Sequence, residues 1–415
     1  MNLRLQRLSV LIAIALSPSL AMATNGYFQH GYGVKAQGIG GVGIALPQDG
    51  LAAATNPAGT ALVGDRLDVG VTWFAPERGA SIAGNGGVGN NGSFNGDGKS
   101  SFLIPELGYT KQLSSTTAVG VAVYGNGGMN TTYNSGVPLF GTSKAGVNLE
   151  QLFISPSIAW KPAEDQAIGA ALNFAYQRFE AKGLQNFDNA TTSASPGNVT
   201  DKGVDTSTGF GLRLGWTGQI TKDLTLGATW SSKINASKFS KYKGLFADGG
   251  SFDIPENYGV GLAYKATPSL TIAADIEEIK YGSVKSIAAP LPGTGLLGSS
   301  NGAGFGWKDI TVYKLGVSYD YSKDLTLRAG FNHSDQPIPA SQTLFNVLAP
   351  GVVQDHLTFG ATWKTEAGGE LSIAYAHAFK KSVTGSGSIP AAYGNGEANI
   401  HLEENILGAA YGWKF

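Results

Sequence analysis

The most constraining feature of this sequence is a two-residue alternation of side-chain type. Between Thr208 and Trp216 the even positions are the large apolar residues Phe210, Leu212, Leu214 and Trp216, whereas the odd positions are Gly or Arg. The same split recurs in segments that begin at Leu224, Leu270, Tyr313 and Leu357. Successive side chains of a β-strand point to opposite faces, so each segment predicts a strand with one apolar face and one small or polar face.

The alternation favours strands that face lipid. Aromatic residues lie at the ends of the apolar face, as in the interfacial girdles of membrane barrels. A soluble sandwich also alternates, but we would then expect a solvent face rich in Lys and Glu, and only 14% of this chain is charged. Backbone groups in lipid must be paired within the protein, so only a closed barrel can use such strands. We therefore predict an all-β transmembrane barrel.

The spacing of turns and loops predicts the number of strands. Long polar or Gly-rich connections cover 80–100, 128–149, 181–207, 239–251, 283–308, 335–355 and 382–401. Short turns lie near Ser114-Ser115, Ala163-Glu164, Thr221 to Asp223, Thr267-Pro268, Ser322 to Asp324 and Ala367-Gly368. Six short turns alternating with seven long connections give 14 antiparallel strands with both ends on one side. An even number of strands, short turns and long outer loops are typical of outer-membrane barrels.

The first residues indicate export. Arg4 and Arg7 precede an apolar run from Leu8 to Leu16, and Ala21-Met22-Ala23 fits a signal-peptidase site. We therefore assign 1–23 as a signal peptide and expect the bacterial outer membrane as the destination. The formal net charge of −1 gives no footprint for nucleic-acid binding.

Residues 24–66 precede the first predicted strand and differ from the rest. They are rich in Gly and Ala, carry little charge and include apolar residues such as Phe28, Ile39 and Leu51. Trailing disordered segments are usually polar. We therefore predict that 24–66 form a plug, or hatch, inside a barrel made by 67–415.

Short motifs in this segment resemble a known family. Asn25-Gly26-Tyr27-Phe28, Gly38-Ile39-Gly40-Gly41 and Asn56-Pro57-Ala58-Gly59 are similar to the hatch of FadL-type outer-membrane transporters. The resemblance covers the whole mature chain. It implies passive transport of hydrophobic small molecules, either long-chain fatty acids or aromatic hydrocarbons, by a monomer that has no enzyme activity. Fatty acids are the first expectation.

The resemblance also implies two carboxylate-binding residues. Trp307-Lys308-Asp309 resembles the family segment that carries a Lys, and Tyr176-Gln177-Arg178 resembles the segment that ends in an Arg. The alternation places Lys308 on the lumen face. It places Arg178 on the lipid face unless a bulge intervenes. The other lumen charges, among them Arg213, Asp275 and Lys314, are expected to pair with one another.

Glycines end the third predicted strand. Ala118 to Tyr124 runs into Gly125-Asn126-Gly127-Gly128, and glycines inside strands mark bends and bulges. The family has a lateral opening at a kink in its third strand, so the resemblance implies that the opening lies here. A loop that simply starts at these glycines is the alternative. We expect Asn56-Pro57-Ala58 to lie behind the opening.

The last residues resemble an assembly signal. Tyr411, Trp413 and Phe415 share one face of the final strand, and Phe415 ends the chain. A terminal aromatic residue of this kind is typical of barrels that the outer-membrane assembly machinery inserts, with outer-membrane lipids and lipopolysaccharide as the surroundings.

Other functions are less well supported. Gly38 to Gly43 matches G-x-G-x-x-G but lacks the preceding strand that a dinucleotide site requires, so we expect no cofactor. The five His show no ligand spacing, so no metal is expected. Two alternatives remain open: a general porin, and a barrel phospholipase for which His377 is the only candidate base.

Overall fold

The structure is a computed structural model that describes residues 25–366 and 368–415. The predicted signal peptide lies outside the described residues. Fourteen strands form one closed antiparallel barrel, and a short strand, β2 (Gly92–Asn95), adds to the end of β1. The barrel strands are β1 (Arg66–Ala83), β3 (Phe102–Gln112), β4 (Thr117–Asn130), β5 (Gly146–Ala163), β6 (Gln166–Lys182), β7 (Asp205–Gln219), β8 (Leu224–Ser231), β9 (Asn257–Thr267), β10 (Leu270–Ile279), β11 (Ile310–Asp320), β12 (Leu325–Ser334), β13 (Asp355–Lys364), β14 (Gly369–Val383) and β15 (Glu397–Lys414).

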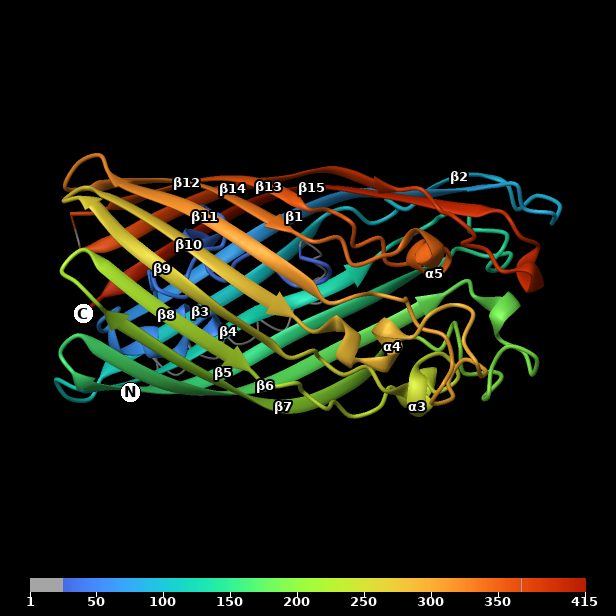
Figure 1. Cartoon of the computed structure of the whole chain (residues 1–415), viewed down its shortest axis with the longest axis horizontal. Helices are drawn as coiled ribbons and strands as arrows, with labels where there is room; N and C mark the ends of the chain where they lie inside the picture. The colour runs from blue at the N-terminus through green and yellow to red at the C-terminus, as the bar shows by residue number, and fades with distance from the viewer. Residues whose placement is uncertain (1–24, 367) are drawn as a thin grey trace, which may run out of the picture.

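The barrel closes between its first and last strands. β1 and β15 pair from Arg66↔Lys414 to Ala83↔Glu397, and every other strand pairs with its neighbour in sequence. Short hairpins lie at one end of the barrel, with the C-terminus, and the long connections lie at the other (Figure 1). We call these the turn end and the loop end. The prediction of 14 antiparallel strands is confirmed.

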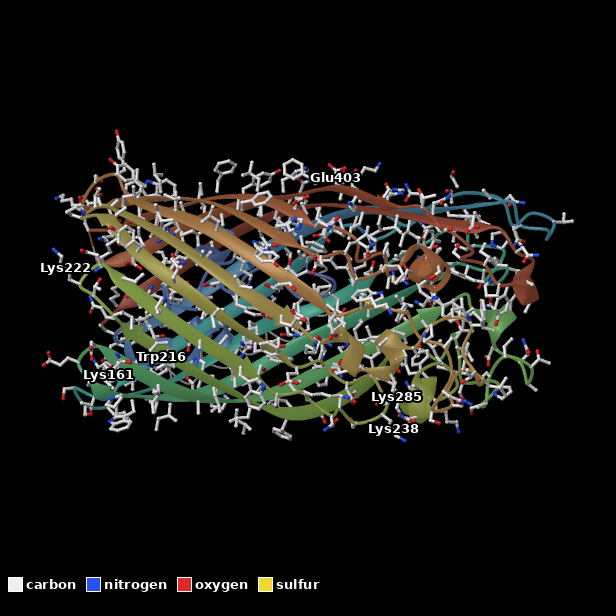
Figure 2. All side chains as sticks on the ribbon, in the orientation of Figure 1. Lys161, Trp216, Lys222, Lys238, Lys285 and Glu403 are labelled. Atoms are coloured by element: carbon white, nitrogen blue, oxygen red, sulfur yellow. The ribbon has the colours of Figure 1, made fainter. Side chains whose placement is uncertain are left out.

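The alternation places side chains as predicted. Phe210, Leu212 and Leu214 of β7 are exposed on the outside, whereas the intervening Arg213 is buried on the inside. Side chains such as Trp216 and Lys222 project from the wall near the turn end, and Glu403 projects from the outer surface nearer the loop end (Figure 2). The outer face therefore offers lipid a wide apolar surface, which is a property of membrane barrels.

The helices are short and occur in the segment before β1 and in the connections between strands. No helix in the described part of the chain is long and apolar enough to cross a membrane. Three helices precede β1: α2 (Val34–Gln37), η1 (Ala52–Ala54) and η2 (Pro57–Ala61). The others lie in the loop-end connections: η3 (Gln185–Phe187), η4 (Ser240–Tyr242), α3 (Ala247–Gly250), η5 (Tyr281–Ser283), α4 (Lys285–Ala288), η6 (Ala340–Gln342), α5 (Thr343–Asn346) and η7 (Ala391–Tyr393).

The third barrel strand is longer than predicted. β4 continues past the four glycine-rich positions to Asn130, because its pairing with β5 persists to Asn130↔Asn148. The register between the two strands shifts between Gly125 and Gly127. These residues therefore form a bulge inside a strand and do not begin a loop.

Candidate functional site

Residues 25–63, which we call the inner segment, lie against the inward face of the wall. Most of them are buried, and α2 contacts β13 and β14 while η2 contacts β5, β6 and β7. Inward glycines make this close approach possible. A Cβ on Gly330 would lie 2.2 Å from the Gly40 nitrogen, and one on Gly169 would lie 2.3 Å from the Pro57 carbonyl carbon. The glycines of the inner face therefore allow the backbone of the inner segment to pack directly against the wall.

Carboxylates of the wall bind backbone N–H groups of the inner segment. Asp68 accepts from Gly50 at 2.8 Å, Glu106 from Val34 at 2.9 Å, and Asp275 from Gly43 at 2.8 Å. Hydrogen bonds to a charged acceptor are stronger than neutral ones. The wall thus holds the inner segment from several strands.

An ion-pair cluster at the turn end joins the inner segment to both ends of the barrel sheet. Glu370 of β14 pairs with Lys35 at 2.5 Å, with Arg66 at 3.0 Å and with Lys414 at 2.5 Å. Lys35, Arg66 and Glu370 are all buried. The expectation that lumen charges pair mainly with one another was incomplete, because many of them hold the inner segment instead. Lys314 does pair with Glu277, at 2.9 Å, but Arg213 donates to the Thr55 carbonyl.

The Asn-Pro-Ala motif is fixed by its asparagine. The Asn56 amide donates to the carbonyls of Ile44 and Trp216, at 2.7 and 2.9 Å, and its oxygen accepts from the Ala58 nitrogen at 3.1 Å. Ala58 packs on Ala118, Ala159 and Ala167 in a cluster of small residues. The motif therefore lies against β5 to β7 and not behind the glycines of β4, which corrects the placement expected from the sequence.

The start of the inner segment lies behind the bulge of β4. Phe28 forms a β-bridge with Gly127, the Gly128 nitrogen donates to the Tyr27 carbonyl at 3.0 Å, and the Gln29 nitrogen donates to the Asn126 carbonyl at 3.2 Å. Gly127 has no room for a side chain, since a Cβ there would lie 1.9 Å from the Tyr27 oxygen. The glycine at this position is required by the inner segment.

The wall itself is interrupted beside this bulge. β3 pairs with β4 only from Gln112↔Ala118 to Leu107↔Val123. β3 still pairs with β1 as far as Phe102, and β4 still pairs with β5 as far as Asn130. The segments 102–106 and 124–130 thus face each other without forming a ladder. Backbone groups of the second segment bond instead to Tyr27 and Gln29, as unpaired backbone at membrane depth requires.

One tyrosine holds the first residues of the inner segment. The Tyr281 hydroxyl accepts from the nitrogens of Tyr27 and Phe28, at 3.1 and 3.3 Å, and donates to the Asn25 carbonyl at 2.6 Å. Gly26 lies under the same ring and is left-handed, with φ of 67°. We call residues 25–28 the hook. Nothing in the sequence indicates this contact, because the partners lie more than 250 residues apart.

An apolar pocket opens among the loop-end connections. The space free of protein atoms in it, counted together with the open solvent at its mouth, is about 510 Å³, and no charged side chain lines it in the described residues. The lining includes Phe140, Phe179, Phe187, Phe246, Leu297 and Phe305. Aromatic rings link this pocket to the hook: Phe305 contacts Trp307 at 6.5 Å between centroids, Trp307 contacts Tyr281 at 5.1 Å, and Tyr281 contacts Tyr27 at 5.2 Å.

A chain of hydrogen-bonded amides lies beside the hook. The Asn126 amide donates to Gln151 at 3.0 Å, Gln151 donates to Gln177 at 2.9 Å, and Gln177 donates to the Phe252 carbonyl at 3.0 Å. All three amides are buried. Burial also lowers the pKa of His30 to about 4, so this ring beside the hook is neutral at neutral pH.

Neither predicted carboxylate partner faces the lumen. Lys308 is exposed in the connection before β11, where its backbone donates to Pro337. Its alternation with Lys314 fails because the strand begins only at Ile310. β6 pairs regularly with β7 through Arg178↔Thr206, and no bulge turns Arg178 inward. Arg178 instead pairs with Glu150 at 3.1 Å.

The remaining sequence candidates lie on the outer face. His377 contacts the Asn405 oxygen at 3.0 Å and Glu403 at 3.7 Å, and within the described chain no serine hydroxyl bonds to it. Tyr411 and Trp413 lie in contact on β15, and the exposed Phe415 stacks near Tyr109. Their use as an assembly signal stays a prediction. Across the described residues, no group of three His, Asp or Glu could hold a metal ion.

A closed, lipid-facing barrel that holds a buried N-terminal segment belongs to the class of outer-membrane channels. The family described as "Outer membrane protein transport protein (OMPP1/FadL/TodX)" matches residues 20–415, and the chain belongs to this family. It is therefore a transport protein and not an enzyme. None of the curated proteins compared with the chain matches it.

Solved structures share the fold at low sequence identity. A FadL homologue of Pseudomonas aeruginosa has a TM-score of 0.72 at 15% identity and covers 94% of this chain and 100% of its own. The toluene transporter TodX of Pseudomonas putida has a TM-score of 0.69 at 17% identity, with coverage of 94% and 100%. The toluene transporter TbuX of Ralstonia pickettii has a TM-score of 0.65 at 18% identity, with coverage of 93% and 99%.

Proposed function

We propose that this protein carries uncharged hydrophobic compounds across the outer membrane and releases them sideways through the wall between β3 and β4. The observation that carries the proposal is the continuous aromatic path from the apolar loop-end pocket to the hook. The hook in turn pairs with β4 where the β3–β4 ladder stops. The inner segment acts as the plug that blocks the straight route along the barrel axis.

The energetics favour the lateral route. A hydrophobic ligand that leaves apolar contacts for water loses about 25 cal/mol for each Å² exposed. Release through the wall into lipid avoids most of this cost. In this mechanism the ligand enters the loop-end pocket, moves along the rings of Phe305, Trp307 and Tyr281, and displaces the hook from the bulge of β4.

The substrate class follows from charge. A fatty acid needs a cation near its carboxylate, but Lys308 and Arg178 lie outside the path, and the polar groups of the path are amides. The Arg78 guanidinium beside the exit already donates to Asn130, Pro76 and Lys99. An unpaired charge in such surroundings is costly. We therefore favour neutral compounds of the size of a single aromatic ring over the fatty acids expected from the sequence. Two of the solved relatives are toluene transporters, which supports this choice.

The test is a substitution at the bulge. Gly127→Val places a branched side chain where only 1.9 Å separates a Cβ from the Tyr27 oxygen, so it must displace the hook. We expect uptake of labelled toluene by cells to fall sharply at normal outer-membrane levels. Gly86→Val is the matched control, because a Cβ there meets its nearest atom at 3.5 Å. Wild-type uptake by the Gly127 variant would exclude this exit, and uptake of oleate but not toluene would exclude the substrate class.

A further inference from the structure

A buried acid lies beside the wall opening. The Glu404 side chain is fully buried, at 0% exposure, on the inward face of β15. Neither of its carboxylate oxygens has a hydrogen-bond partner in the described part of the chain. Buried polar groups without partners are rare in native proteins, and each one requires a reason. The stability of the barrel supplies none, because an unpaired buried carboxyl group is destabilising.

Glu404 lines a recess that borders the opening. The recess holds about 330 Å³ of empty space including its mouth. Phe74, Met129 and Leu402 provide apolar lining, and the backbone around Pro350 closes one side. Met129 belongs to the part of β4 that has left β3, and the pairing of β1 with β3 ends at Phe74. A compound that leaves between β3 and β4 therefore passes this recess.

The neighbouring arginine does not satisfy the acid. Arg78 lines the same recess, but its guanidinium is occupied elsewhere. It donates to both oxygens of Asn130, at 2.7 and 2.5 Å, and to the carbonyls of Pro76 and Lys99, at 3.0 and 2.5 Å. A weaker contact to Asp97, at 3.5 Å, uses the remaining donor. Arg78 thus ties β1 to β4 across the gap and leaves the Glu404 oxygens free to accept.

We infer that Glu404 is a specificity-determining residue that binds the hydroxyl group of a hydroxylated hydrophobic compound, such as a phenol, within this recess. The apolar lining contacts the ring, and the carboxyl group of Glu404 accepts a hydrogen bond from the hydroxyl group. A hydroxyl group fits better than an ammonium group, because the fixed positive charge of Arg78 in the same recess repels a second cation. The inference rests on the proposed function, since the ligand must reach the recess through the channel.

The test compares two compounds of nearly the same shape. p-Cresol carries a hydroxyl group where p-xylene carries a methyl group. The dissociation constants of both are measured by isothermal titration of the purified full-length protein in detergent micelles. We define selectivity as the ratio of the p-xylene constant to the p-cresol constant. Glu404→Leu removes the acceptor, and we expect selectivity to fall about fivefold, the usual effect of losing a hydrogen bond between uncharged groups.

Matched variants separate the possible outcomes. Glu403→Gln changes the next residue of β15, which projects from the outer surface (Figure 2), and we expect unchanged selectivity. If Glu404→Leu fails to fold, Glu404→Met replaces it, with the same loss expected, because Met also lacks an oxygen acceptor. Unchanged selectivity in either folded Glu404 variant, or an equal loss of affinity for both compounds, would overturn the inference. Failure of both compounds to bind the wild-type protein would overturn the proposed function itself.

Discussion

The two halves of the lumen use polar groups in different ways. Toward the turn end, charged side chains are paired with one another or bonded to the backbone of the inner segment, as Glu370 is to Lys35 and Asp275 is to Gly43. Toward the loop end, the path is lined by aromatic rings and by amides such as Gln151 and Gln177, and Arg78 and Glu404 lie beside its exit. On the proposed function, one half fixes the inner segment, whereas the other half admits and releases the ligand.

The division follows from the cost of burial. A buried ion pair contributes little to net stability but is costly to break, so it fixes a segment in one arrangement. Amides and aromatic rings carry no net charge to desolvate, and a neutral ligand can slide along them. Substitutions in the turn half should therefore release the docked inner segment. Substitutions in the loop half should cause smaller changes, mainly in ligand binding.

The largest expected effect is in the turn half. Glu370→Ala leaves the buried Lys35 without its partner, which should destabilise the docked inner segment by about 3–5 kcal/mol. We expect faster proteolysis of residues 25–63 and increased entry of small sugars into liposomes. Glu77→Ala, an exposed acid on the outer face, is the control. If the Glu370 variant were as resistant to proteolysis and as impermeable to sugars as wild type, the ion pairs would not hold the inner segment.

A smaller effect is expected in the loop half. Tyr281→Phe keeps the ring but removes the hydroxyl that bonds to Asn25, Tyr27 and Phe28. The buried Tyr27 nitrogen then loses its acceptor, whereas the Phe28 nitrogen keeps a hydrogen bond of 3.3 Å to the Asn25 carbonyl. The loss should destabilise the docked hook by about 2 kcal/mol. Hydrogen exchange at the amides of Tyr27 and Phe28 should accelerate roughly thirtyfold. Sugar entry should stay low, since the turn-half anchors remain.

The control for this variant is Tyr258→Phe, because Tyr258 is exposed on the outer surface. If Tyr281→Phe released the whole inner segment, as judged by proteolysis, the two halves would not be independent.

The barrel was predictable because its information is local. Alternation along one strand sets its two faces, and short turns such as Thr221 to Asp223 set the order of strands, so the count of 14 needs no long-range contact. The inner face was harder to interpret. The sequence suggested only a small or polar inner face, but the structure shows that glycines such as Gly330 and Gly169 allow the backbone of the inner segment to approach the wall.

The site was less predictable because its contacts are distant in sequence. Tyr281 meets the hook across 254 residues, and no periodicity encodes that contact. The alternation of β15 places Glu404 on the inner face of the barrel. That its carboxyl group has no partner could be seen only from the structure, in which Arg78 donates to other groups. The predicted lumen position of Lys308 was wrong for a local reason. Lys308 precedes Ile310, the first residue of β11, so the alternation of that strand does not extend to it.

The smallest expected effect is that of a substitution at Lys308 on ligand affinity. Lys308→Ala should change the affinity for p-xylene or for a fluorescent fatty acid by less than about threefold, because surface substitutions away from a site usually cost within 0.5 kcal/mol. Its side chain is exposed and its backbone contact to Pro337 survives the substitution. Titration of both ligands against wild type measures the change. A tenfold loss for the fatty acid alone would mean that Lys308 reaches the carboxylate of a bound fatty acid. The aromatic path of the loop half would then acquire a cation when such a ligand binds, and the preference for neutral compounds would have to be abandoned.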